Sequence, residues 1–404
     1  MPDWTNRVSR IGSKLDDRFD DLKFRLRKRS GSFKRLQVLA YRGFGNSSEI
    51  YLKGRVLSER ESPKLEADIK PGADGATVGE PQGDSIFTNI LATYRRFHSI
   101  EVPRAVVRVT YGGESHEVVT NEDGFFELHL KNAESGSTNP WREIKVELTS
   151  PKTEALEPVV VTAQAIVPSP TARYGIISDI DDTVIVSHAT SLLKVAYTTF
   201  ARNARGRVAF PGVGAFYRAL QAGTTDSEFN PIFYVSSGPW NLYDLLVEFM
   251  ELNEIPLGPI LLQDYGLAEK QIISASHRDH KLAQIRKLLE TYPDLPFILI
   301  GDSGQHDPEI YRKVLEEVPN RIRAIYIRDV SKEARDSEVR KLAGEVKKHG
   351  GELLLVQNTL EAARHAVEKG FISAAALPEI SGEKRENENA AIVEEISGEL
   401  SPSK

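Results

Sequence analysis

Near-continuous apolar runs in the second half of the chain limit its possible folds more than any other feature. The runs are residues 174–178, 231–235, 259–262, 297–300 and 324–327. They alternate with stretches of helical character, and strands that are apolar on both faces are typical of a parallel sheet covered by helices. We therefore predict an α/β domain over 170–376, with a parallel sheet and helices on both of its faces.

Residues 36–168 show a different pattern, in which apolar and polar residues alternate. This period of two is typical of strands with one buried face. It recurs at 49–57, 105–111, 125–130 and 143–148. The turn at 121–124, with the sequence NEDG, is a hairpin signal. We predict a β-sandwich-like domain over 36–168, interrupted at 60–83 by a flexible loop rich in Pro, Gly and acidic residues.

The two ends of the chain differ in charge. In residues 1–35, apolar side chains recur at steps of three and four with Lys and Arg around them, which predicts a basic amphipathic helix. Such a helix either docks on a protein surface or lies on an anionic membrane, and the sequence leaves both possibilities open. Residues 377–404 are acidic and lack aromatic residues, so we predict a disordered tail there.

Composition excludes several classes of function. The chain has no cysteine, which rules out disulfides, thiolate catalysis and Cys-ligated metal centres. A net charge of −6 argues against a general nucleic-acid binder. The apolar runs are far shorter than the roughly 18 residues of a membrane-spanning helix, and the N-terminus lacks the apolar part of a secretory signal. We expect a cytoplasmic protein without a transmembrane segment, with peripheral membrane association left open.

Acidic residues follow two of the apolar runs. Asp179 and Asp181 come after the first run, and Asp302 and Asp307 come after the fourth. Ligands of open α/β sheets bind at the carboxyl ends of the strands, where one carboxylate can attack a substrate while another handles a proton. Carboxylate oxygens also suit Mg²⁺, which commonly bridges to a substrate phosphate. Alternatively, these acidic residues could be ordinary turn and helix-capping residues. Polar side chains suited to the same chemistry follow several strands, which argues against that interpretation.

The second apolar run ends in small polar residues. Ser236, Ser237 and Gly238 follow it, and we expect a helix to begin near Pro239. Hydroxyl and backbone N–H groups at such a position form a cradle for phosphate. The three strand ends together favour phosphoryl chemistry.

In their order and strand context, these residues resemble the four motifs of the haloacid dehalogenase (HAD) superfamily. The resemblance implies a HAD-like, Rossmann-like parallel sheet with a small cap insert at 184–207. It implies that Asp179 is the nucleophile and forms an aspartyl-phosphate. It also implies that Asp181 is the general acid/base and binds Mg²⁺ through its backbone carbonyl.

The resemblance extends to the remaining contacts of the site. Lys281, at the expected start of the helix before the fourth run, is implied as a catalytic lysine that neutralises phosphoryl oxygens, and Lys287 is a less favoured alternative. The implied phosphate-binding residues are Thr183, Ser236, Ser237, Gly238 and Lys281. The implied Mg²⁺ ligands are Asp179, Asp181, Asp302 and Asp307.

Longer stretches resemble a narrower group. DIDDT at 179–183, FPGV at 210–213, YVSSGPWNLY at 234–243 and GDSGQHDPEIY at 301–311 are similar to the phosphatidate phosphatase catalytic domain of the actin-patch-protein family, relatives of the lipins. The resemblance covers about residues 170–330. It implies a Mg²⁺-dependent phosphatidate phosphatase that converts phosphatidate to diacylglycerol and phosphate, so the expected partner is a phospholipid substrate.

Two other functions remain open from the sequence. One is a HAD phosphatase of a soluble phosphomonoester, which a large lid would favour, whereas the insert at 184–207 is short. The other is a lipid-binding scaffold with a vestigial phosphatase domain, against which the intact acidic residues and Lys281 argue.

Overall fold

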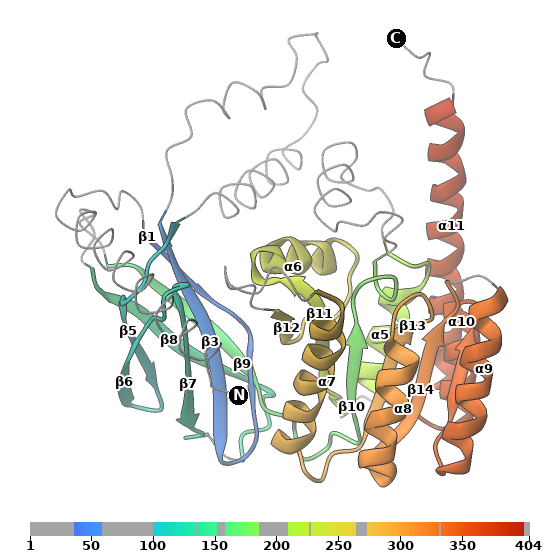
Figure 1. Ribbon diagram of the computed structural model, residues 1–404, viewed down its shortest axis with the longest axis horizontal. Helices are drawn as coiled ribbons and strands as arrows, with labels where there is room; N and C mark the ends of the chain where they lie inside the picture. The colour runs from blue at the N-terminus through green and yellow to red at the C-terminus, as the bar shows by residue number, and fades with distance from the viewer. Residues whose placement is uncertain are drawn as a thin grey trace, which may run out of the picture.

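The computed structural model describes residues 36–58, 100–134, 136–151, 158–185, 209–225, 228–263, 273–330 and 333–399. These residues form an N-terminal sheet and, beside it, a C-terminal α/β part (Figure 1). The predicted helix over 1–35 and the predicted loop at 60–83 lie outside the described residues, as does nearly all of the insert at 184–207.

The C-terminal sheet is parallel, as predicted. Its strands are β10 (Gly175–Asp179), β11 (Ile232–Pro239), β12 (Ile260–Gln263), β13 (Phe297–Asp302), β14 (Ile322–Arg328) and β15 (Leu353–Val356). They lie in the order β12-β11-β10-β13-β14-β15, and every neighbouring pair is parallel. Five of the strands coincide with the apolar runs. The edge strand β15 was not predicted.

Helices cover both faces of this sheet. They are α5 (Val213–Ala222), α6 (Tyr243–Leu252), α7 (Ile273–Thr291), α8 (Asp307–Glu317), α9 (Glu333–Lys348), α10 (Thr359–Glu368) and α11 (Leu377–Glu399). Ile176 and Tyr234 pack with α5, α6 and α10, whereas Ile177 and Val235 pack with α7, α8 and α9. Successive side chains of a strand point to opposite faces, so these two cores lie on opposite sides of the sheet. Among the described helices, none combines the length and apolar character that a membrane span requires.

The described N-terminal residues form a sheet of nine strands. They are β1 (Leu36–Ala40), β2 (Gly43–Gly45), β3 (Glu49–Ser58), β4 (Ile100–Glu101), β5 (Val106–Tyr111), β6 (Glu114–Val119), β7 (Phe125–Lys131), β8 (Trp141–Ser150) and β9 (Val160–Ile166). The main order is β1-β3-β2-β9-β8-β5-β6, with β4 and β7 paired to β3. Side chains from β1, β3 and β7 share one core with side chains from β5 and β8. The sheet therefore folds back on itself around that core.

The hairpin predicted at 121–124 is wrong in its strand pairing. The turn itself forms, because Asn121 Oδ1 accepts hydrogen bonds from the backbone N–H groups of Asp123 and Phe125, and Gly124 has a φ of 77°. The strands on either side, however, pair with different partners: β6 with β5, and β7 with β3. β6 pairs with its neighbour in sequence, β5, across the tight turn at Gly112 and Gly113, whereas β7 pairs with the distant strand β3 and shares a core with it.

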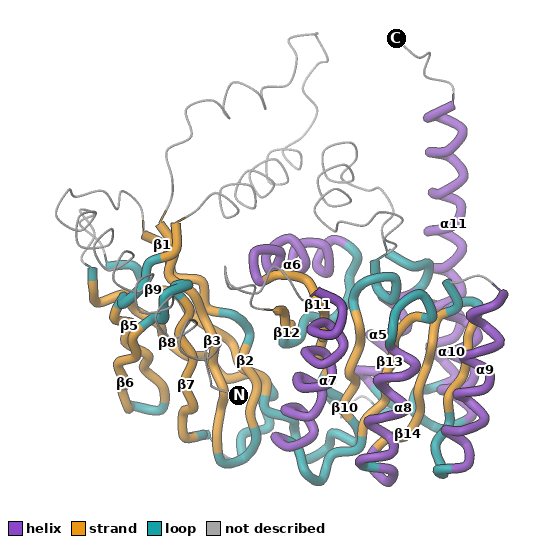
Figure 2. The backbone as a smooth tube through the Cα atoms, viewed as in Figure 1, coloured by secondary structure: helices purple, strands orange, loops and turns teal. Residues whose placement is uncertain are grey.

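The two parts of the molecule share a packed interface. Tyr41 packs on Trp240 with 4.2 Å between ring centroids. The Arg55 guanidinium donates a hydrogen bond of 2.7 Å to Asn241 Oδ1. Figure 2 shows the N-terminal strands next to the β12 edge of the parallel sheet. The N-terminal sheet therefore shields that edge.

The C-terminal segment does not form the disordered tail that its composition predicted. Most of it is the helix α11, and Ile380 is fully buried in the core that also contains α5. Glu383 accepts a hydrogen bond of 2.9 Å from the Ala215 N–H in the first turn of α5, where a negative charge is favoured. The Arg218 guanidinium contacts Glu379 and Glu383 at 2.8 and 2.9 Å. These tertiary contacts order a sequence whose composition is typical of a solvated tail.

Ile380→Ala should therefore destabilise the protein. Removal of a fully buried Ile side chain leaves a cavity, and the expected loss is about 2–5 kcal/mol in the free energy of unfolding. Urea denaturation followed by circular dichroism measures it. The matched control is Glu386→Ala, an exposed position of the same helix, which should change stability by less than about 0.5 kcal/mol. Equal stability of the two variants would show that α11 does not dock in solution.

Candidate active site

Asp179 lies at the carboxyl end of a central strand and is held from both sides. It is the last residue of β10, and it is 1% exposed. Lys281 Nζ, on α7, donates a hydrogen bond of 2.8 Å to Asp179 Oδ1. The Thr183 hydroxyl donates a longer bond of 3.3 Å to Asp179 Oδ2. The carboxylate is thus fixed at the edge of the sheet where a ligand is expected.

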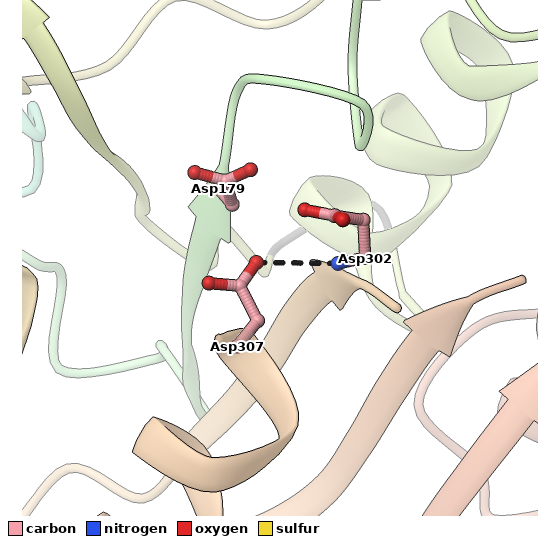
Figure 3. Close-up of side chains that lie close together, drawn as sticks. All are labelled: Asp179, Asp302 and Asp307. Carbon is pink, nitrogen blue, oxygen red and sulfur yellow. Dashed lines mark hydrogen bonds between the residues drawn. The ribbon is translucent and has the colours of Figure 1, made fainter. Parts of the chain in front are cut away.

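Two further buried carboxylates lie beside Asp179. Asp302 ends β13, and Asp307 begins α8. One carboxylate oxygen from each of Asp179, Asp302 and Asp307 lies within 4.8 Å of the others (Figure 3). The Asp302 N–H donates to Asp307 Oδ2 at 3.2 Å, and Lys281 Nζ donates to Asp307 Oδ1 at 2.5 Å. Lys281 therefore bridges two members of this acidic group.

The loop after β13 is built around Asp302. Asp302 Oδ1 accepts hydrogen bonds from the backbone N–H groups of Gly304 and Gln305 at 2.7 and 2.9 Å. Asp302 Oδ2 is buried and has no hydrogen-bond partner among the described residues. At Gly301, a Cβ would lie 2.4 Å from Asp307 Oδ2, so a larger residue would displace Asp307. One oxygen of Asp302 is positioned by the backbone, which leaves the other to bind a ligand.

The electrostatics of the group favour a divalent cation. Burial, reinforced by the neighbouring Asp307 carboxylate, raises the pKa of Asp302 to about 8. Burial also raises the pKa of Asp179 well above its usual range, although the Lys281 ammonium acts in the opposite direction. Three carboxylates face one ammonium, and an oxygen-only donor set of this kind suits Mg²⁺. The residues present therefore fit the expected ion.

The Asp181 side chain is not part of this acidic group. Ser236 Oγ donates a hydrogen bond of 2.9 Å to Asp181 Oδ2, while Oδ1 is buried without a partner among the described residues. Burial raises the pKa of Asp181. The Gln305 side-chain amide lies 3.5 Å from the Asp181 carbonyl oxygen, which places that oxygen beside the loop of Asp302. The backbone turns at Asp182, whose φ of 56° is left-handed.

Most of the predicted phosphate-binding residues lie on one strand. Ser236, Ser237 and Gly238 all belong to β11. Besides its bond to Asp181, Ser236 Oγ accepts a hydrogen bond of 2.9 Å from the Gly238 N–H. The Thr183 hydroxyl lies in the turn after β10, where it bonds the carboxylate at the end of that strand. In this structure the hydroxyls of Ser236 and Thr183 therefore orient the carboxylates of Asp181 and Asp179.

The structure places Lys281 and Lys287 in different surroundings. Both lie on α7, with Lys281 near the middle of the helix and not at its start, where the sequence had placed it. Lys281 is 3% exposed and contacts the acidic residues. The Lys287 ammonium lies 3.2 Å from the centre of the Tyr51 ring, at the interface with the N-terminal sheet. Of the two, Lys281 is therefore the lysine that contacts the acidic group.

Two residues that the sequence analysis did not single out support the geometry. Gln305 contacts both Asp302 and the Asp181 carbonyl, and Gly301 makes room for Asp307. Both belong to a stretch that carries the resemblance, GDSGQHD at 301–307. The resemblance of that stretch could have drawn attention to both residues. The sequence alone, however, does not indicate which residue of the stretch contacts Asp181.

The segment that contains the site matches a known protein family. The matching family model is described as phosphatidate phosphatase APP1, catalytic domain. Residues 174–329 match it. The match confirms the resemblance that the motifs indicated, and every residue of the predicted site lies inside the matched segment. The matched family is one of phosphatases, and the matched segment excludes the N-terminal sheet and the helices α9 to α11.

Two curated relatives have similar sequences. Phosphatidate phosphatase APP1 of Saccharomyces cerevisiae is 34% identical over 195 residues, which are 48% of this chain and 32% of that protein. The uncharacterized protein C29B5.04c of Schizosaccharomyces pombe is 32% identical over 162 residues, 39% of this chain and 25% of that protein. The matched regions thus span about a third and a quarter of these relatives.

Among solved structures, XAC1771, a carbohydrate acetylesterase from Xanthomonas citri, matches over 68% of this chain and 70% of that chain. Its sequence identity is 12% and its TM-score is 0.24. A similarity this weak does not support a conclusion about fold or function.

Proposed function

We propose that this chain is a Mg²⁺-dependent phosphatidate phosphatase that works through an aspartyl-phosphate on Asp179. The observation that carries the proposal is the buried Asp179–Lys281 contact beside Asp302 and Asp307, inside the segment that matches a phosphatase catalytic domain. The proposal includes a HAD-like fold for residues 170–376 and a separate domain over 36–168. It also includes a cytoplasmic location with peripheral contact to membranes, since the substrate is a lipid.

The first step transfers the phosphoryl group to Asp179. Its carboxylate attacks phosphorus in line, and the bond from phosphorus to the lipid alkoxide breaks. Lys281 neutralises charge on the phosphoryl oxygens, and Thr183 keeps Asp179 Oδ2 in place. This half-reaction releases diacylglycerol and leaves the phosphoryl group on Asp179 as an acyl phosphate.

Asp181 is suited to move the protons of both steps. Burial raises its pKa, which favours the protonated form that a general acid requires. Ser236 holds one oxygen, and the other has no partner among the described residues and is available to the leaving oxygen. After the alkoxide takes the proton, the same carboxylate accepts a proton from the water that hydrolyses the acyl phosphate.

Asp179, Asp302 and Asp307 would hold the Mg²⁺ ion. When bound, the ion supplies positive charge to the phosphoryl oxygens in the transition state. The buried Asp302 Oδ2, which has no described partner, and the excess of carboxylates over the single ammonium support this placement. The Asp181 carbonyl would be a further protein donor.

Phosphate release from dioctanoyl phosphatidate and from a panel of soluble phosphomonoesters tests the substrate class. We expect a kcat/KM for phosphatidate at least about 100-fold above that of any soluble ester, a difference of roughly 2.7 kcal/mol in transition-state binding. Equal or better turnover of a soluble ester would keep the mechanism and reject the lipid substrate. Absence of turnover with every ester, in the presence of Mg²⁺, would favour the scaffold function.

A further inference from the structure

A pocket lies between the two parts of the molecule. Its volume is about 460 Å³, within the range of roughly 300–1,000 Å³ that is usual for small-molecule sites. Residues of β2, β3 and β7 and the residues just before β2 line one side, and β12, Trp240 and α7 line the other. The lining includes neither Asp179 nor Lys281, so this interdomain pocket is distinct from the acidic site described above.

Basic side chains give the interdomain pocket a preference for an anion. Its charged lining consists of three basic residues and two acidic ones, namely Arg42, Lys53 and Lys287 against Glu127 and Asp279. Glu127 already accepts a hydrogen bond of 2.5 Å from the Tyr51 hydroxyl. The balance of charge is therefore positive, and a ligand with one negative charge would compensate it.

Lys287 is a lining residue that would interact favourably with such a ligand. Its ammonium makes no ion pair with any described carboxylate and lies instead over the Tyr51 ring. Burial lowers its pKa; the Glu127 carboxylate opposes this effect, and the positive charge of Lys53 adds to it to a smaller degree. An anion between the two lysines would offset this repulsion and favour the charged form of Lys287.

Apolar side chains line one part of the pocket, next to the buried indole N–H of Trp240. Aromatic rings of Tyr41, Phe44 and Trp240 line the pocket together with the apolar strand β12. The Trp240 indole N–H is buried and has no hydrogen-bond partner among the described residues. A buried donor of this kind is costly unless an acceptor reaches it. A ligand with an acceptor atom and an apolar body would satisfy both features.

We propose that the interdomain pocket binds a small amphiphilic anion, with its carboxylate or phosphate between Lys53 and Lys287 and its apolar body against Trp240 and β12. The pocket joins residues of both sheets, so such a ligand would also hold the two parts of the chain together. Binding there requires neither Asp179 nor a metal ion, and it is independent of the activity proposed above.

Isothermal titration of the full chain with laurate below its micellar concentration tests the proposal. Laurate carries one carboxylate and an apolar chain, and a phosphatase cannot hydrolyse it. We expect one site per chain, with affinity lowered about tenfold in Lys53→Gln and in Lys287→Gln. Lys287→Arg keeps the charge but changes the shape of the group over the Tyr51 ring, so it should bind more tightly than Lys287→Gln. The matched control is Lys145→Gln, an exposed position of the N-terminal sheet, which should bind as wild type does.

Three results would overturn the proposal. The first is no laurate binding by the wild-type chain, and the second is unchanged affinity in a folded Lys53→Gln variant. The third is loss of laurate binding in Asp179→Asn, which would place the ligand in the acidic site. A parallel titration with inorganic phosphate separates the two sources of the anion: affinity equal to that of laurate would indicate a soluble anion and reject the amphiphile.

Discussion

Asp179→Asn should lower phosphate release by at least about 10⁴-fold, the order of loss that follows removal of a covalent nucleophile. An amide cannot form the acyl phosphate, although it keeps nearly the same shape between Lys281 and Thr183. Burial raises the pKa of Asp179, so a neutral side chain at this position should not weaken folding. Colorimetric phosphate assays measure turnover, and circular dichroism verifies the fold.

The matched control for this variant is Asp182→Asn. Asp182 is close in sequence, carries the same charge and has a left-handed φ of 56° that asparagine adopts readily. We expect its turnover to stay within about twofold of wild type. Comparable losses in the two variants would mean that the acidic turn as a whole, and not the Asp179 carboxylate, supports activity. Residual turnover above about 1% in Asp179→Asn would reject the nucleophile assignment.

Mg²⁺ should stabilise the wild-type protein and fail to stabilise Asp302→Asn. An ion at about 100 times its Kd adds about 2.7 kcal/mol to the free energy of unfolding, which corresponds to a Tm rise of several degrees. Asp302 contributes a buried oxygen with no described partner, so its loss removes a donor that no other described side chain replaces. Differential scanning fluorimetry with and without EDTA measures the shift.

Asp181→Asn provides the comparison for Asp302→Asn. The Asp181 side chain contacts Ser236 and lies outside the acidic group, so its amide variant should keep the Mg²⁺-dependent rise in Tm while losing most turnover. Such a result would separate metal binding from proton transfer. If Asp181→Asn and Asp302→Asn lost the rise equally, the Asp181 carboxylate would itself be a ligand, and the proposed division of roles would be wrong.

Local sequence was sufficient to predict the strands that carry the site. Continuous apolar runs predicted five of the six strands of the parallel sheet, and the position of Asp179 and Asp302 at strand ends follows directly from where those runs stop. The physical reason is that a strand buried on both faces must be apolar throughout, so its first polar residues mark its end. β15 has the apolar sequence LLLV and follows the same rule, although it was not among the predicted strands.

The choice between Lys281 and Lys287 needed the tertiary structure. The two lysines are six residues apart on α7, which rotates their side chains by about 120° around the helix axis. Sequence spacing alone does not say which direction faces the acidic residues. The packing of α7 decides it: one lysine contacts Asp179 and Asp307, and the other lies at the interface with the N-terminal sheet.

The sequence by itself determined the parallel sheet, the residues at its carboxyl edge and the family resemblance, because each depends on apolar runs or on motifs a few residues long. Only the tertiary structure decided the pairing of β7, the helix α11 and the direction of the Asp181 side chain. Each of these depends on a partner far away in the chain: β3 for β7, Arg218 and Ala215 for α11, and Ser236 for Asp181. Contacts of that kind are set by the packing of the whole fold, so local composition does not predict them.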